Sequence, residues 1–190
     1  MRKINTIVVH CSATPPSMDI GVEEIRKWHV EENSWTDIGY HFVIRRDGTV
    51  ESGRSLKRPG AHVKNYNSDS IGICWVGGVS EANGRPQDNR SAEQTAALFD
   101  LIQDLQQKFP GTALMGHRDF EGVTKACPCF DVREWFVKQC NTEKKELEEA
   151  PAKEERKGAL EKMALLSTTF KFILSITWKL WRHHRSSRQR

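Results

Sequence analysis

The sequence has little of what marks a secreted protein held together by disulfides. Its 190 residues include five cysteines, a small and odd number that argues against a disulfide-built scaffold. The apolar segment that follows Met1 ends at His10, which is too short for the core of a signal peptide, and no small-residue cleavage site follows it. We therefore expect synthesis in the cytoplasm without a signal peptide.

Two common zinc motifs, HExxH and CxxC, are also missing, so spacing within one segment establishes no metal site. Suitable ligands nevertheless follow two short apolar segments: His10 ends the first and His117 follows the second, with Cys127 and Cys129 close behind. A single histidine at a strand end is more often an ordinary hydrogen-bonded residue. Two histidines and a thiolate, however, form a three-ligand zinc set that leaves a fourth position for water, as in catalytic sites.

Both Cys127 and Cys129 are candidates for the thiolate, and each is equally compatible with a role as a small buried apolar residue. Pro128 between them disfavours a disulfide, because two cysteines one residue apart close a strained ring. Cys11, next to His10, suggests a thiol protease. We discount that function, because neighbours on a strand point to opposite faces.

Helical and strand patterns alternate along the first 140 residues. A serine followed three residues later by glutamine, at Ser91 and Gln94, is the capping-box spacing that starts a helix. Asp47-Gly48 between two β-branched segments is a hairpin signal. The pattern predicts an α/β fold in which helices flank a mixed central β-sheet, with strands and helices in this order: strand 4–10, helix 21–33, hairpin 40–52, strand 71–76, helix 92–109, strand 112–115 and a helix capped by Asp131.

The polar segment from Pro59 to Asp69 lies between two predicted strands. It contains His62, Asn65, Tyr66 and Asn67, and we expect a loop that is too polar to enter the core.

Six short stretches follow one another over about residues 3–138: 10–14 (HCSAT), 39–42 (GYHF), 46–50 (RDGTV), 70–73 (SIGI), 116–118 (GHR) and 125–128 (KACP). In sequence and in order they resemble the zinc-dependent N-acetylmuramoyl-L-alanine amidases, and most closely the amidase-type lysozymes (endolysins) of tailed bacteriophages. The resemblance implies the amidase, or peptidoglycan-recognition-like, fold and a zinc cofactor.

The resemblance implies that His10, His117 and Cys127 are the metal ligands. Cys129 occupies a position at which the family pattern requires no thiol, so it ranks second. Zinc lowers the pKa of a bound water to about 7, which supplies hydroxide for attack on an amide carbonyl at neutral pH.

Tyr40 and Lys125 match the two other residues that amidase activity requires in the family. A lysine ammonium suits the oxyanion that forms during attack, and a phenol suits water orientation or proton relay. The implied substrate is peptidoglycan, cut between N-acetylmuramic acid and L-alanine so that the bacterial cell lyses. His62 and Asn67 fall where the family's substrate groove lies, which implies substrate binding.

Negative charge is absent from the end of the chain, with no acid after Glu161. Residues 141–190 hold 12 Lys and Arg against seven Glu, a net charge of +5. Residues 163–182 form an apolar segment with one narrow polar stripe, and a basic end follows. Such a segment fits a helix on a membrane surface, a membrane-spanning anchor, or a helix docked on the catalytic domain.

We favour membrane contact through this amphipathic segment and expect no nucleic-acid partner. The predicted domains are an amidase domain at 1–140, a charged linker at 141–162 and the basic amphipathic helix at 163–190. We expect action on the cell wall, with membrane association through the tail.

Two other functions compete with a lytic amidase. A module of the same fold that binds peptidoglycan without cutting it is expected to lack the ligand cysteine, whereas Cys127 is present. A membrane-permeabilising protein would use the amidase domain only for targeting.

Overall fold

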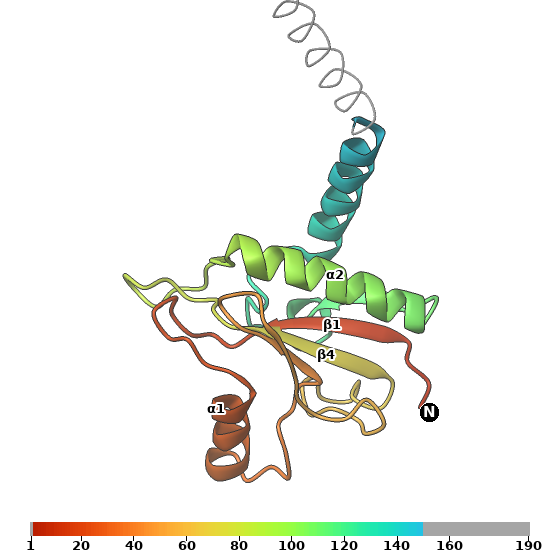
Figure 1. Cartoon of the computed structure of the whole chain (residues 1–190). Helices are drawn as coiled ribbons and strands as arrows, with labels where there is room; N and C mark the ends of the chain where they lie inside the picture. The colour runs from red at the N-terminus through yellow and green to blue at the C-terminus, as the bar shows by residue number, and fades with distance from the viewer. Residues whose placement is uncertain (1, 150–190) are drawn as a thin grey trace, which may run out of the picture. The chain divides into compact units, whose positions relative to one another are not determined.

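A five-stranded mixed sheet organises the part of the chain that this computed structural model describes, residues 2–149. The strand order is β3-β2-β4-β1-β5, and only the β2–β3 pair is antiparallel. The long strands β1 and β4 run side by side through its middle (Figure 1). The strands are β1 (Thr6–Cys11), β2 (Phe42–Ile44), β3 (Val50–Ser52), β4 (Ser70–Trp75) and β5 (Ala113–Gly116).

One face of the sheet is covered by α2 (Ala92–Lys108), which lies along β1 and β4 in Figure 1. Residues Leu98, Ile102 and Leu105 of α2 pack there against apolar side chains from β1 and β4. Because side chains alternate along a strand, Ile7, Val9 and Cys11 face α2. The neighbouring Val8 belongs to a separate cluster with Val63 and Phe120, on the other face.

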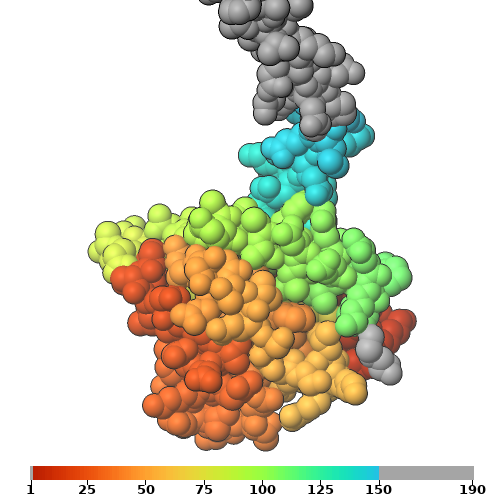
Figure 2. Space-filling view, viewed as in Figure 1, coloured from red at the N-terminus to blue at the C-terminus, as the bar shows by residue number. Residues whose placement is uncertain are grey.

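The second apolar cluster is built around α1 (Val22–Lys27), whose Val22 and Ile25 pack against Ile38, Val43 and Cys74. A five-residue π-helical turn (Trp28–Glu32) extends α1, and this was not expected from the sequence. In the space-filling view the red-to-orange N-terminal part of the chain covers the lower part of the face shown, and green α2 lies above it (Figure 2).

The short 3₁₀ helix η2 (His117–Asp119) follows β5, and residues 132–149 are helical. The predicted cap at Asp131 is confirmed, since its Oδ1 accepts a hydrogen bond of 2.9 Å from the backbone N–H of Glu134. Val132 of this helix is buried in the core against which Trp135 and Phe136 pack.

The predicted element order and the α/β class are confirmed, with small shifts of the boundaries. The strand β2 begins at Phe42, two residues after the predicted start at Tyr40. The hairpin at Asp47-Gly48 is present. Two backbone hydrogen bonds close it: the Arg45 N–H donates to the Thr49 carbonyl, and the Gly48 N–H donates to the Arg45 carbonyl.

One expectation about the 59–69 loop was wrong. His62 and Val63 are buried, with exposed fractions of 9% and 2%. The polar His62 is accommodated because both ring nitrogens lie within hydrogen-bonding distance of buried partners, His10 and Ser70.

The chain divides into two units, Met1–Gln139 and Cys140–Arg190, and the structure describes the second only as far as residue 149. The predicted tail, residues 163–190, and most of the predicted linker lie outside the described residues. Among residues 2–149, no helix is both long and apolar enough to span a bilayer.

Candidate active site

Two neighbouring parallel strands bring the candidate histidines together. Val9 of β1 pairs with Gly116 of β5. His10 and His117, the residues that follow this pair, therefore lie side by side at the C-terminal ends of the two strands. His10 is almost fully buried, with 1% exposure, and His117 is half-buried. Their ring centroids are 4.6 Å apart.

The third candidate, Cys127, is delivered by the loop between η2 and the helix that begins at residue 132. The backbone N–H of Arg118 donates a 2.7 Å hydrogen bond to the carbonyl of Cys127, which ties the loop to η2. Gly116 permits close packing beneath it, because a Cβ at that position would lie 2.8 Å from Cδ of Pro128.

The ligand atoms of His10, His117 and Cys127 all lie within 4.8 Å of one another. The distance from Cys127 Sγ to His10 Nδ1 is 3.9 Å. Zinc bonds of about 2.3 Å to sulfur and 2.0–2.1 Å to nitrogen at the tetrahedral angle place two such ligands about 3.6 Å apart. The Cys127–His10 spacing exceeds this value by a few tenths of an ångström, and the donor types and their proximity fit a zinc ion once the three ligand atoms move closer together.

The electrostatic environment keeps both histidines neutral, as metal ligation requires. Burial lowers the pKa of His10 well below its usual value, with further lowering from His62, His117 and Lys125. Burial also lowers the pKa of His117, again with help from Lys125. Lys125 is exposed and lines the same pocket as Cys127, so a cation lies beside the cluster, and its charge lowers the pKa of both histidines.

Tyr40 lies beside His10 of the same cluster. Its ring centroid is 5.2 Å from that of His10 and 5.5 Å from that of His29. Burial raises the pKa of the phenol well above its usual value, so Tyr40 stays protonated near neutral pH and is able to donate a hydrogen bond.

Cys129 lies outside this set of three. Its Sγ lies 3.2 Å from the carbonyl of Gly78, to which it donates, and 3.8 Å from Sγ of Cys11. Burial raises the pKa of Cys129 to about 12, which keeps it a thiol. Cys11 faces the α2 side of the sheet, whereas His10 contacts His62 on the other side, as the alternation of a strand predicts.

The two residues expected at the substrate groove occupy different environments. Asn67 is half-buried, and its Oδ1 accepts hydrogen bonds from the backbone N–H groups of His62 and Val63, at 2.8 and 3.0 Å. The His62 ring lies beneath the cluster, with Nδ1 3.0 Å from His10 Nε2 and Nε2 3.3 Å from Ser70 Oγ. Burial lowers the pKa of His62 to about 3. Ser70 begins one of the stretches that match the family, 70–73, but no sequence signal indicated a role for it in this group.

Two pockets flank the cluster. One, of about 390 Å³, is lined by His117 together with residues of the 63–66 and 120–123 loops. The other, of about 400 Å³, is lined mainly by apolar atoms and includes Lys125, Cys127 and Cys129. Each pocket therefore adjoins a different member of the cluster, His117 in the first and Cys127 in the second.

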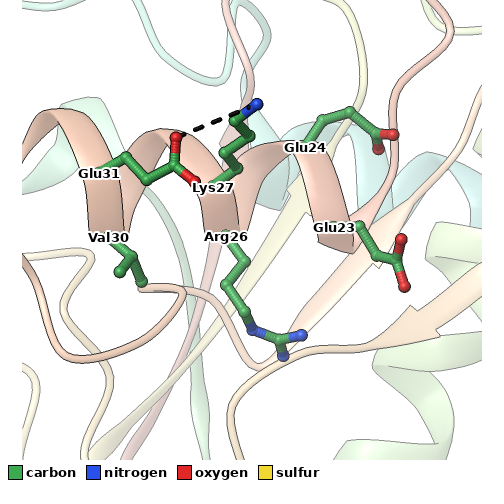
Figure 3. Close-up of a pocket in the computed structure, with 6 residues that line it drawn as sticks. All are labelled: Glu23, Glu24, Arg26, Lys27, Val30 and Glu31. Carbon is green, nitrogen blue, oxygen red and sulfur yellow. Dashed lines mark ion pairs between the residues drawn. The ribbon is translucent and has the colours of Figure 1, made fainter.

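A further pocket, of about 640 Å³, lies on the exposed side of α1 and its π-helical turn. Figure 3 shows its six lining residues, which are mostly charged, and the ion pair between Lys27 and Glu31. None of the candidate site residues lines it, so it is not the candidate active site.

Comparison with known proteins gives consistent matches. A sequence model of the family described as N-acetylmuramoyl-L-alanine amidase matches residues 1–130. The endolysin of Klebsiella phage KP32 is 50% identical over 137 residues, which cover 72% of this chain and 88% of that protein. The endolysin of Escherichia phage T7 is 47% identical over 134 residues, covering 70% and 86%.

Among solved structures, the N-acetylmuramoyl-L-alanine amidase LysC from Clostridium intestinale matches with a TM-score of 0.61 at 28% identity, covering 73% of this chain and 86% of that one. The chain therefore belongs to the N-acetylmuramoyl-L-alanine amidase family. Within that family it is similar to phage endolysins over most of their length.

Proposed function

We propose that this protein is a peptidoglycan hydrolase that cleaves the amide bond between N-acetylmuramic acid and L-alanine and thereby lyses bacterial cells. Family membership and the similarity to phage endolysins support the reaction and the substrate. The observation that carries the assignment of the site is the convergence of three ligand atoms, from His10, His117 and Cys127, within 4.8 Å.

In this proposal His10, His117 and Cys127 hold a catalytic zinc ion through two imidazole nitrogens and a thiolate. When bound, zinc supplies Lewis acidity and activates water for attack on the amide carbonyl. The burial of His10 keeps the nitrogen available as a neutral ligand and excludes bulk water from that side of the site.

Lys125 and Tyr40 supply the remaining groups. The Lys125 ammonium, close enough to act on both histidines, stabilises negative charge as it develops on the carbonyl oxygen. The protonated phenol of Tyr40, beside the His10 ring, donates a hydrogen bond that orients the attacking water or passes on its proton.

The two cysteines of the 125–131 loop provide a matched test. Cys127→Ser should abolish the release of peptides from purified cell walls, and the variant should no longer retain zinc after dialysis. Cys129→Ser should keep both properties, because Cys129 donates to Gly78 rather than pointing into the cluster and serine can make the same bond. Unchanged hydrolysis by Cys127→Ser would remove the zinc assignment.

We also propose that residues 163–182 contact the bacterial membrane. The support is the sequence pattern alone, an apolar segment with lysines, tryptophans and a basic end, since these residues lie outside the described part of the chain. Leakage of a dye from anionic lipid vesicles should be greater with the full chain than with a 1–140 truncation. Equal leakage rejects this role and leaves the amidase proposal untouched.

A further inference from the structure

His62 lies at the centre of a buried chain of polar contacts that starts at a candidate metal ligand. His10 Nε2 is 3.0 Å from His62 Nδ1, and His62 Nε2 is 3.3 Å from Ser70 Oγ. Ser70 Oγ in turn donates to the backbone carbonyl of Tyr66 at 2.6 Å. The side chains of His10, His62 and Ser70 are all buried.

The Tyr66 carbonyl, at the far end of this series of polar contacts, determines which atom is the donor in each hydrogen bond. The Tyr66 carbonyl only accepts, so the hydroxyl of Ser70 donates to it and presents a lone pair to His62. His62 Nε2 then carries the hydrogen that fills this acceptor. A neutral imidazole with a hydrogen on Nε2 has a free lone pair on Nδ1, and His10 Nε2–H is the donor that meets it.

The same arrangement fixes which nitrogen His10 presents to the cluster. With its hydrogen on Nε2, His10 has its lone pair on Nδ1, the atom that lies 3.9 Å from Cys127 Sγ. Metal-bound histidines typically donate their second ring N–H to an acceptor that orients the ring and raises its basicity.

Close packing leaves the His62 ring little freedom to turn. A Cβ on Gly72 would lie 2.6 Å from His62 Cδ2, and a Cβ on Gly60 would lie 2.4 Å from the same atom. These two glycines therefore allow the ring to lie directly against backbone. Asn67 holds the start of the loop by accepting from the His62 backbone N–H.

We propose that His62 is a positioning residue, which accepts a hydrogen bond from His10 Nε2 and so holds the Nδ1 lone pair of His10 toward the zinc ion. The inference rests on the proposed function and gives His62 a role beneath the metal cluster rather than at the substrate. Ser70 is a second positioning residue, because its hydroxyl accepts from His62 Nε2 and so selects the tautomer of His62.

Zinc affinity, measured by competition with a chromophoric chelator, tests this role without using hydrolysis as the readout. His62→Phe keeps an aromatic ring but removes the acceptor, and it should weaken zinc binding about 10–100-fold. His62→Gln retains an amide oxygen as acceptor and should recover part of that loss. His29→Phe is the matched control, because His29 lies outside the cluster and should leave zinc affinity at the wild-type value.

Urea unfolding of the metal-free proteins identifies any variant that fails to fold. If His62→Phe does so, Ser70→Ala carries the same test, since it leaves the imidazole in place but removes the group that sets its tautomer. Weaker zinc binding by the folded variant supports the proposal. Wild-type affinity in a folded variant, or equal losses in His62→Phe and His62→Gln, overturns it. Absence of zinc binding by the wild-type chain overturns the proposed function as well.

Discussion

At the level of single residues, neighbouring histidines have different roles, as candidate metal ligands or as hydrogen-bond partners of the backbone. His10 and His117 converge on Cys127, whereas His41 serves the backbone around β4: its Nδ1 accepts from the Gly72 N–H and its Nε2 donates to the Arg58 carbonyl. Burial lowers the pKa of His10, His117 and His41 alike, so the pKa does not distinguish their roles. Their contact partners do.

Lys125 should matter for catalysis and not for metal binding. Lys125→Ala should reduce peptide release from cell walls about 10²–10³-fold, as expected when one donor to an oxyanion is removed. Zinc affinity should stay the same or increase, because the variant lacks a positive charge that disfavours a second cation at His10 and His117, while burial still keeps both rings neutral. The measurements are a wall-hydrolysis rate and a chelator competition.

Lys27→Ala is the matched control for this change, since Lys27 is an exposed lysine of α1. Its hydrolysis rate should equal that of the wild type. A Lys125→Ala protein that hydrolyses cell walls at the wild-type rate contradicts the role given to the ammonium.

At the scale of helices and strands, the start of α2 links this helix to the sheet. Ser91 Oγ accepts from the Gln94 backbone N–H at 2.9 Å and donates to the Arg46 carbonyl at 2.9 Å. The fully buried Gln94 side chain donates in turn to the carbonyls of Ile44 and Val76. The capping box therefore also fixes where the helix lies over β2.

Ser91→Ala should lower the free energy of unfolding by about 1–2 kcal/mol, the upper part of the range for losing a helix cap. Ser91→Thr keeps both hydrogen bonds and should lose much less. Urea denaturation of the three proteins measures the difference. Equal stability of the alanine variant and the wild type would show that the cap contributes nothing to the fold.

The elements that the sequence predicted correctly are those with local signals. The capping box at Ser91, the Asp47-Gly48 turn and the apolar segment that became β4 each depend on residues close together in the chain. The burial of His62 was missed because its partners His10 and Ser70 lie 52 and 8 residues away, and no local pattern records their contact. The π-helical turn after α1 likewise has no local signature.

The site itself was predictable in part. Family resemblance indicated the cluster of three, and the strand register explains why two of its members meet. The choice between Cys127 and Cys129 depends on how one loop packs against Gly116 and Gly78, which spacing alone does not determine.

At the scale of the whole molecule, buried histidines should make stability depend on pH. Burial lowers the pKa of His41 from 6.5 to about 4, so the unfolded chain binds a proton between these values that the folded chain does not. The neutral His41 therefore contributes to the free energy of unfolding in full above pH 6.5, and this contribution is lost as the pH falls toward 4. For His41 alone the loss amounts to about 3 kcal/mol.

Urea unfolding of the metal-free chain at pH 6.5 and pH 4.5 should show about 2 kcal/mol of this loss, because the unfolded histidine is already half protonated at pH 6.5 and the folded one is still mostly neutral at pH 4.5. His41→Gln removes the titrating group and should show a smaller difference between the two pH values, although it is less stable at both. An identical pH dependence in the two proteins would mean that His41 is not held neutral by the fold.

We propose that His10, His117 and Cys127 share one zinc ion at the C-terminal ends of β1 and β5. Anomalous diffraction from crystals of the zinc-loaded protein, collected on both sides of the zinc absorption edge, would locate this ion. We expect a single strong peak about 2.0–2.3 Å from His10 Nδ1, from a ring nitrogen of His117 and from Cys127 Sγ. A zinc peak bound by other residues, or none between these three, would contradict it.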